Sequence, residues 1–137
     1  MNELIFALLT WIGNHTDYEV KLNLPNIVLT EKYNMCTQYG ISQKTNCDAS
    51  GLMGFYNKKV TIYLHDDFNF HESIDASRLV HELVHYVQWK NGEQKRRCLG
   101  HLELEAYELQ DLWRAQQGLE PVADDFKKIM LAASCDT

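Results

Sequence analysis

The stretch SIDASRLVHELVHYVQWKN, residues 73–91, carries the strongest structural signal in this chain. Apolar residues recur in it every three or four positions, which predicts an amphipathic helix, and Gly92 follows as a typical helix stop. At about 100° per residue, His81 and His85 lie together about a third of a turn away from one apolar stripe. The stripe consists of Val80, Leu83, Val84 and Val87. The helix can therefore bury one side while both histidines face a cleft.

Residues 81–85 spell H-E-x-x-H. Residues four apart share one face of a helix, so the imidazoles of His81 and His85 can bind one zinc ion. Glu82 projects from the edge of that face, where its carboxylate can take a proton from a zinc-activated water. The alternative is that two surface or core histidines match the motif by chance. We expect a zinc site on His81 and His85, with Glu82 as the catalytic general base.

A catalytic zinc needs a third protein ligand, which we sought on a second predicted helix at residues 98–117. The candidates there are His101, Glu103, Glu105, Glu108 and Asp111. Glu105 falls inside or beside the apolar face of that helix, and a carboxylate facing the core is costly unless it meets a cation or a metal. We therefore predict Glu105 as the third ligand. It can instead form a salt bridge to an arginine, and His101 is an alternative ligand or transition-state donor.

The pattern of His81, Glu82, His85 and a glutamate on the next helix resembles the gluzincin group of zinc metallopeptidases. In that group a glutamate ligand follows the motif after about twenty residues, and Glu105 follows His85 by twenty. Residues 103–107 (ELEAY) look like the ligand helix of small bacterial members, and the resemblance covers about residues 52–117. It implies a zincin-like minimal catalytic domain that hydrolyses peptide bonds, with zinc as its cofactor.

The chain departs from larger gluzincins in two respects. They have an acidic residue one turn after the glutamate ligand that orients the first histidine, whereas position 109 is Leu here, so Glu108 or a backbone carbonyl must take that part. They also have a separate domain with a histidine or tyrosine that stabilises the oxyanion, and this chain is too short for one. The candidates for that role are Tyr56, Tyr63, Tyr86, Tyr107 and His101.

The rest of the chain predicts one α+β domain over residues 1–137, with a small antiparallel or mixed sheet and packed helices. Asn2 can cap a first helix that ends at Gly13-Asn14, and a short strand covers residues 27–30. Residues 34–50 are polar and predict a loop. Residues 52–64 predict a β-hairpin with its turn at 57–59, and Pro121 suits the first turn of a last helix.

The composition is that of a soluble globular protein, with 45% hydrophobic and 23% charged residues among 137. A formal net charge of −6 argues against nucleic acid or an anionic membrane as partner. No stretch is long enough to cross a membrane, and residues 4–12 lack the flanks of a signal peptide.

Four cysteines, without a C-x-x-C pair, favour disulfides over a structural zinc knuckle. Short chain connections favour the pairs Cys36–Cys47 and Cys98–Cys135, although four free buried thiols remain an alternative. Disulfides are typical of oxidising compartments, so we expect a secreted or periplasmic protein whose signal peptide is not part of this sequence.

The most direct functional prediction is a zinc metallopeptidase. Its substrate is a peptide or protein that binds extended along an arm of the 52–64 hairpin. One alternative is an exported, disulfide-stabilised binding module with a structural or non-catalytic zinc, and another is hydrolysis of a non-protein amide. The sequence does not indicate an oligomeric state.

Overall fold

The computed structural model describes residues 1–21, 23–41, 43, 46–47, 54–57 and 61–135, with the backbone alone for 54–57. The contacts within it divide the chain into two compact units. The first unit contains residues 1–24 and 70–137, and the second contains residues 25–69. A single domain over residues 1–137 stays a prediction.

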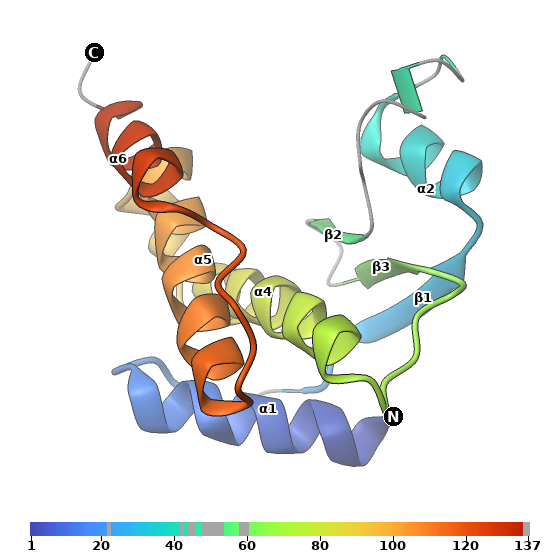
Figure 1. Ribbon diagram of the computed structural model, residues 1–137, viewed down its shortest axis with the longest axis horizontal. Helices are drawn as coiled ribbons and strands as arrows, with labels where there is room; N and C mark the ends of the chain where they lie inside the picture. Colours follow the sequence, from blue (N-terminus) through green and yellow to red (C-terminus); the bar gives the residue numbers. More distant parts are fainter. Residues whose placement is uncertain (22, 42, 44–45, 48–53, 58–60, 136–137) are drawn as a thin grey trace. The chain divides into compact units, whose positions relative to one another are not determined.

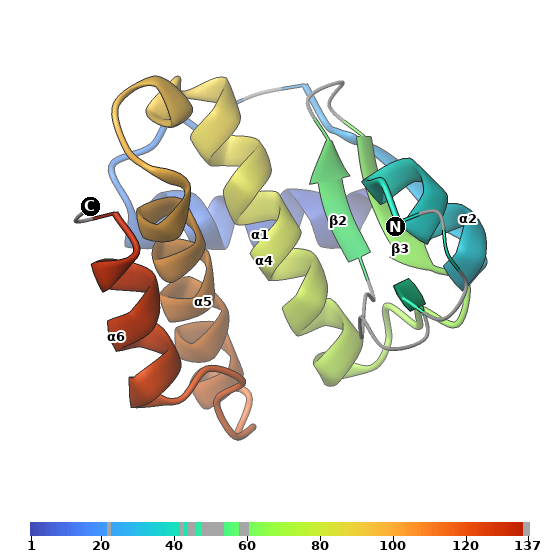
Figure 2. The same ribbon diagram turned by 90° about the horizontal axis from the view of Figure 1, so that it is seen from above.

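The first unit is helical. It consists of α1 (Asn2–His15), α4 (Ser73–Lys90), the 3-10 turn η1 (Glu93–Lys95), α5 (Leu99–Gln116) and α6 (Asp125–Ala133). Helix α5 contacts α4 on one side and α6 on the other, and α1 contacts α4 (Figure 2). The H-E-x-x-H motif thus lies on a helix with neighbours from before and after it in the chain.

Helix α4 is the centre of the unit's core. Its buried positions surround most of its circumference, which is wider than the stripe expected from periodicity. They are Ala76, Ser77, Leu79, Val80, His81, Glu82, Leu83, Val84, Tyr86, Val87 and Gln88. Burying a histidine, a glutamate and a glutamine among these apolar residues is costly unless each finds a polar partner.

The segment between α1 and the second unit is attached to the end of α4. The Glu19 backbone N–H donates to Asn91 Oδ1 and the Asn91 amide donates to the Glu19 carbonyl, each over 3.0 Å. The Tyr86 hydroxyl donates to the Asn23 carbonyl. Gly92 then ends the helix with φ 75°, a left-handed conformation that glycine adopts without strain. These bonds hold Glu19 and Asn23 beside α4.

The second unit contains β1 (Asn26–Thr30), α2 (Lys32–Tyr39), β2 (Gly54–Asn57) and β3 (Thr61–His65). Its three strands are ordered β1-β3-β2 (Figure 1). β1 pairs with β3 in parallel and β2 pairs with β3 antiparallel. The sheet is therefore mixed, and the purely antiparallel alternative is wrong.

The hairpin between β2 and β3 confirms the expected strand pairing over its described part. Its predicted residues 52, 53 and 58–60, including most of the turn, lie outside the residues that the structure describes. Among the strands that the structure describes, β2 lies at the edge of the sheet, with β3 as its neighbour. Side chains of β3 alternate, with Ile62 and Leu64 fully buried.

Two element predictions are wrong. Part of the loop predicted at 34–50 is helix α2, which begins where the Glu31 carboxylate accepts from the backbone N–H groups of residues 33 and 34. It ends at Gly40, with φ 109°. Pro121 does not lie in the last helix: Asp124 is the N-cap, and its carboxylate accepts from the Lys127 backbone N–H over 2.7 Å. In both cases a side-chain cap sets the boundary.

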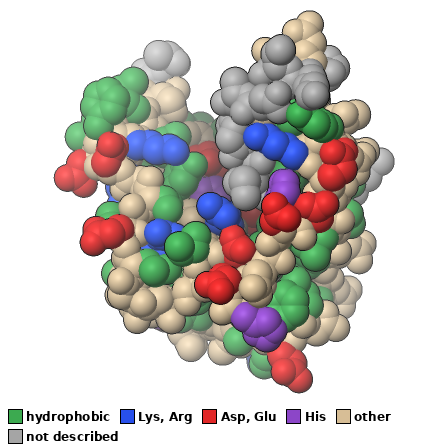
Figure 3. Space-filling model, turned by 45° about the vertical axis from the view of Figure 1, so that its right-hand side comes forward, with side chains coloured by type: hydrophobic (Ala, Val, Ile, Leu, Met, Phe, Trp, Pro, Cys, Tyr) green, Lys and Arg blue, Asp and Glu red, His purple; other side chains and the backbone are tan. Residues whose placement is uncertain are grey.

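Both predicted disulfides are confirmed, one in each unit. Cys36 pairs with Cys47 and Cys98 with Cys135, at Cα separations of 5.8 and 6.0 Å. In the described part of the chain, no helix combines the length and apolar character needed to span a membrane. Acidic and basic side chains are interspersed on the face drawn in Figure 3.

Candidate metal centre

His81, His85 and Glu103 bring one ligand atom each to a common point between α4 and α5. His81 Nε2 lies 3.2 Å from His85 Nε2. Glu103 Oε2 lies 3.6 Å from His81 Nε2, and Glu103 Oε1 pairs with His85 Nε2. All three side chains are buried or half-buried. The two motif histidines thus meet as predicted, and the carboxylate beside them is Glu103.

The outer nitrogens of both rings are bound by side-chain amides. His81 Nδ1 lies 3.0 Å from Gln110 Oε1, and His85 Nδ1 lies 2.9 Å from Gln88 Oε1. An amide oxygen only accepts, so each Nδ1 carries the hydrogen and each Nε2 keeps its lone pair. Each ring is therefore held in the tautomer that offers Nε2 to a metal.

These contacts leave three acceptor groups facing one another, namely two Nε2 lone pairs and one carboxylate. Acceptors this close need a cation between them, either a proton or a metal ion. Two nitrogens bound to a tetrahedral zinc at about 2.0–2.1 Å lie about 3.3–3.4 Å apart. The observed 3.2 Å agrees with that separation. The donor set of two imidazoles and one carboxylate is also one that zinc takes.

The charges at the site reflect this arrangement. Burial lowers the pKa of His85, but the hydrogen bond to Glu103, the charges of Glu82 and Glu103 and the bond to Gln88 together outweigh it, and the pKa rises to about 8. Burial raises the pKa of Glu103, but its bonds to the two histidines outweigh that effect and bring it well below its usual range. Without a metal, a proton on His85 therefore supplies the positive charge that the carboxylate needs.

Glu82 is almost fully buried, with a relative exposure of 9%. Burial raises the pKa of its carboxyl, while the neighbouring His81 and His85 act in the opposite direction. A carboxylate that binds protons more readily than usual, next to a metal-binding pair, is suited to accept a proton from a bound water.

Glu105 does not join the two histidines, so its predicted position in the ligand set is wrong. Its Oε1 accepts from the Tyr18 hydroxyl over 2.5 Å, from Gln88 Nε2 over 3.0 Å and from Arg97 Nη1 over 3.1 Å. The physical argument that led to Glu105 required a cation or a metal for a carboxylate near the core. Arg97 is that cation, which was the alternative reading of this residue.

The other candidates on α5 also lie away from the histidines. His101 Nε2 lies 3.2 Å from the Ala132 carbonyl, and Glu108 is exposed. The Asp111 carboxylate accepts from the backbone N–H groups of Val122 and Ala123. None of these three belongs to the group formed by His81, His85 and Glu103.

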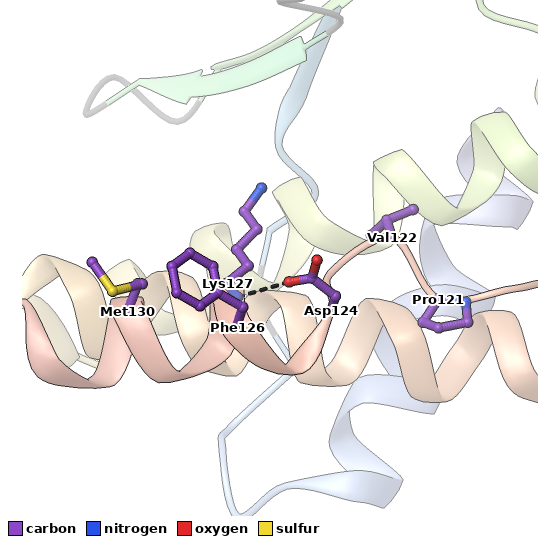
Figure 4. A pocket seen from close by; sticks show the side chains of 6 residues that line it. All are labelled: Pro121, Val122, Asp124, Phe126, Lys127 and Met130. Atoms are coloured by element: carbon purple, nitrogen blue, oxygen red, sulfur yellow. Dashed lines mark hydrogen bonds between the residues drawn. The ribbon is translucent and has the colours of Figure 1, made fainter.

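Among the predicted oxyanion-stabilising candidates, Tyr107 lies at the site. Its ring meets the His81 ring edge to face, with ring centroids 4.5 Å apart. Lys127 reaches it from α6, with Nζ 3.0 Å from the Tyr107 hydroxyl. Figure 4 shows that this lysine side chain points away from Phe126 and Met130.

The remaining candidates are elsewhere or not described. The Tyr86 hydroxyl binds the Asn23 carbonyl, and Tyr63 belongs to the second unit. The side chain of Tyr56 lies outside the described part of the chain. Tyr107 is thus the candidate that the described geometry favours.

Two signals in the sequence point to Gln88 and Gln110, which the predictions missed, and to Glu103, which was a candidate but not the ligand chosen. Glu103, Tyr107 and Gln110 lie at positions i, i+4 and i+7, so they form one stripe along α5. Gln88 follows His85 by three residues, which places its amide beside the ring. Hydrophobic periodicity does not detect such polar stripes, because it scores the apolar face alone.

Comparison with known proteins identifies the chain at the level of family. No curated protein and no solved structure matches it. One family model, described as "Domain of unknown function (DUF6647)", matches residues 1–137. The chain therefore belongs to the DUF6647 family.

Proposed function

We propose that this protein is a zinc-dependent peptidase whose metal is held by His81, His85 and Glu103. The observation that carries the proposal is the convergence of two Nε2 lone pairs and one carboxylate, with the outer nitrogen of each ring bound to an amide oxygen. Such a set of acceptors requires a cation, and its spacing suits zinc. The buried Glu82 next to it adds the proton acceptor that hydrolysis requires.

Each residue has a separate part in the reaction. When bound, zinc supplies positive charge that polarises the peptide carbonyl and acidifies water. Gln88 and Gln110 keep the two imidazoles in the metal-binding tautomer. Glu82 takes the proton from the attacking water and passes it to the leaving amine. We propose that the Tyr107 hydroxyl, whose ring lies against His81, donates to the developing oxyanion.

A three-ligand site favours catalysis over a structural role. Structural zinc sites have four protein ligands, whereas catalytic sites have three and leave one position for water or substrate. Within the described residues, the group at the motif contains three metal-binding side chains. The alternative of a binding module with a closed zinc site therefore has less support than a peptidase.

The proposed substrate is an extended peptide that adds to β2, the edge strand of the sheet in the described part of the chain. The two disulfides support work in an oxidising compartment, for which we propose secretion or the periplasm.

The test compares wild type with Glu82→Gln on a mixture of peptides, with zinc measured on the same samples. We expect Glu82→Gln to keep one zinc per chain and to lose nearly all cleavage, because an amide cannot take a proton at neutral pH. Glu108→Gln, an exposed glutamate on α5, is the control and retains cleavage. Full cleavage by Glu82→Gln, or a folded wild type that holds zinc and cuts no peptide, would refute the proposal.

A further inference from the structure

The Gln88 amide connects the metal site to a second polar cluster. Gln88 is 1% exposed and makes three hydrogen bonds. Its Nε2 donates to the Leu102 carbonyl over 2.9 Å and to Glu105 Oε1 over 3.0 Å. Its Oε1 faces His85 Nδ1 at 2.9 Å. One buried side chain therefore contacts both His85 and the carboxylate that does not bind the metal.

The orientation of this amide follows from the chemistry of its neighbours. A carboxylate and a backbone carbonyl only accept hydrogen bonds, so the NH₂ group of Gln88 must face Glu105 and Leu102. Its oxygen must then face His85. That oxygen accepts only, so His85 Nδ1 must carry the hydrogen, and Nε2 is left with the lone pair that a metal takes.

Glu105 is fixed in turn by two donors. The Tyr18 hydroxyl and Arg97 Nη1 both donate to Glu105 Oε1, and Arg97 Nη1 also donates to the Tyr18 hydroxyl over 3.0 Å. Burial and the hydrogen bond to the Glu105 carboxylate raise the pKa of Tyr18, so the hydroxyl stays a donor. The carboxylate is therefore held as an acceptor toward Gln88.

We propose that Glu105 is a positioning residue for the metal: through Gln88 it sets the tautomer of His85. This inference rests on the proposed zinc site. The ion pair between Glu105 and Arg97 contributes too little to folding stability to explain the presence of Glu105 at this position. Both side chains are partly exposed, at 24% and 31%, and such pairs add little to folding stability. The bond to buried Gln88 is the contact through which Glu105 acts on the site.

The experiment measures zinc affinity by competition with a chromophoric chelator for wild type and three variants. The buffer contains no thiol reductant, because the ligand atoms of Cys98, His101 and Cys135 lie within 4.8 Å of one another and reduction frees both sulfurs to bind zinc. Glu105→Met removes the acceptor and should weaken zinc binding about 10-fold, the low end for residues behind a ligand. Glu105→Gln keeps an oxygen that can accept from Gln88, so it should retain most of the affinity.

The control for helix position is Glu108→Met, an exposed glutamate on the same helix, which should bind zinc like wild type. Thermal unfolding distinguishes a purely structural role of Glu105 from a positioning role. Loss of the ion pair to Arg97 should change the stability of Glu105→Met and Glu105→Gln alike. Zinc affinity that falls in Glu105→Met, which lacks the acceptor, and is kept in Glu105→Gln, which lacks only the charge, supports the positioning role. Zinc affinity that falls equally in both variants overturns it.

Two further measurements remain decisive if Glu105→Met folds poorly. Gln88→Met should weaken zinc at least as much, and adding Glu105→Met or Glu105→Gln to it should cause no further loss, because Glu105 acts through Gln88. Side-chain ¹⁵N shifts of metal-free protein, recorded well above pH 8 where the His85 ring is neutral, should show hydrogen on Nδ1 in wild type and mixed tautomers in Glu105→Met. Additive losses, or an unchanged tautomer in Glu105→Met, overturn the inference.

Failure of the proposed function and failure of the positioning role give different results. A folded wild type that takes up no zinc refutes the proposed function itself. Wild type with one zinc, together with wild-type affinity in Glu105→Met and Gln88→Met, refutes the positioning role and leaves the site intact.

Discussion

The sharpest test of the ligand set is Glu103→Gln. The change keeps the size of the side chain and removes the negative charge that lies against both imidazoles. Among the described residues, Glu103 is the carboxylate that joins His81 and His85. The amide that replaces it is a poor zinc ligand, so the site retains two good protein ligands.

The magnitude follows from the number of ligands. A structural zinc site with four protein ligands binds with about 10–16 kcal/mol at neutral pH. An equal share for each ligand is about 2.5–4 kcal/mol, which corresponds to about a 10²- to 10³-fold weaker Kd. This loss is at least ten times larger than the one expected for Glu105→Met, because in the proposed site Glu103 contacts the metal whereas Glu105 acts through Gln88.

The assay is elemental analysis after dialysis, followed by chelator competition to obtain Kd. We expect one zinc per chain in wild type and in Glu105→Gln, and much less than one in Glu103→Gln. Glu108→Gln controls for loss of an acidic residue from the same helix. Retention of zinc with wild-type Kd in Glu103→Gln would refute the ligand set. Loss of zinc in Glu105→Gln alone would restore Glu105 as the third ligand.

Three further predictions concern the substrate and the packing of α6. Adjacent N–H groups of β2 point alternately toward β3 and away from it, so Phe55→Pro and Tyr56→Pro remove N–H groups of opposite direction. The variant that loses the outward N–H should fold, judged by circular dichroism, and cleave peptides poorly. Full cleavage by both variants contradicts strand addition. Gly100→Ala places a Cβ 2.6 Å from a backbone oxygen of α6. The clash outweighs the gain in helix propensity, so the free energy of unfolding in urea should fall by a net amount of about 1–2 kcal/mol. An increase would show that α6 shifts freely. Replacing Cys98 and Cys135 by serine opens a link across 37 residues and should lower the same quantity by about 4 kcal/mol, with an unchanged value refuting the bond.

Elements with a strong hydrophobic period were the most predictable part of the fold. The helix expected at residues 73–91 is Ser73–Lys90, and the one expected at 98–117 is Leu99–Gln116. Helix α2 lacks such a period, since only Met35 and Cys36 are buried in it. Its ends depend on a carboxylate cap and a glycine, and the Cys36 disulfide ties it to the chain beyond. Tertiary links of this kind outweigh local composition.

The site was predictable where its residues are neighbours on one helix. His81 and His85 meet because four residues complete about one turn, and this holds wherever the helix lies. The choice between Glu103 and Glu105 depends on how α5 is rotated against α4, which the sequence of α5 alone does not specify. Arg97 decided the matter physically: once it satisfies Glu105, the remaining carboxylate facing the histidines is Glu103.

The contact between Tyr18 and Glu105 links the amino-terminal segment to the metal thermodynamically. A ligand that binds only the ordered state stabilises every contact which that state requires. In the proposed site, bound zinc should therefore hold residues 16–21 against the rest of the helical unit, and detachment of that segment should weaken zinc binding by the same free energy. Proteolysis or a crosslink near Tyr18 would then act as an effector of metal affinity, at a position remote in sequence from every ligand.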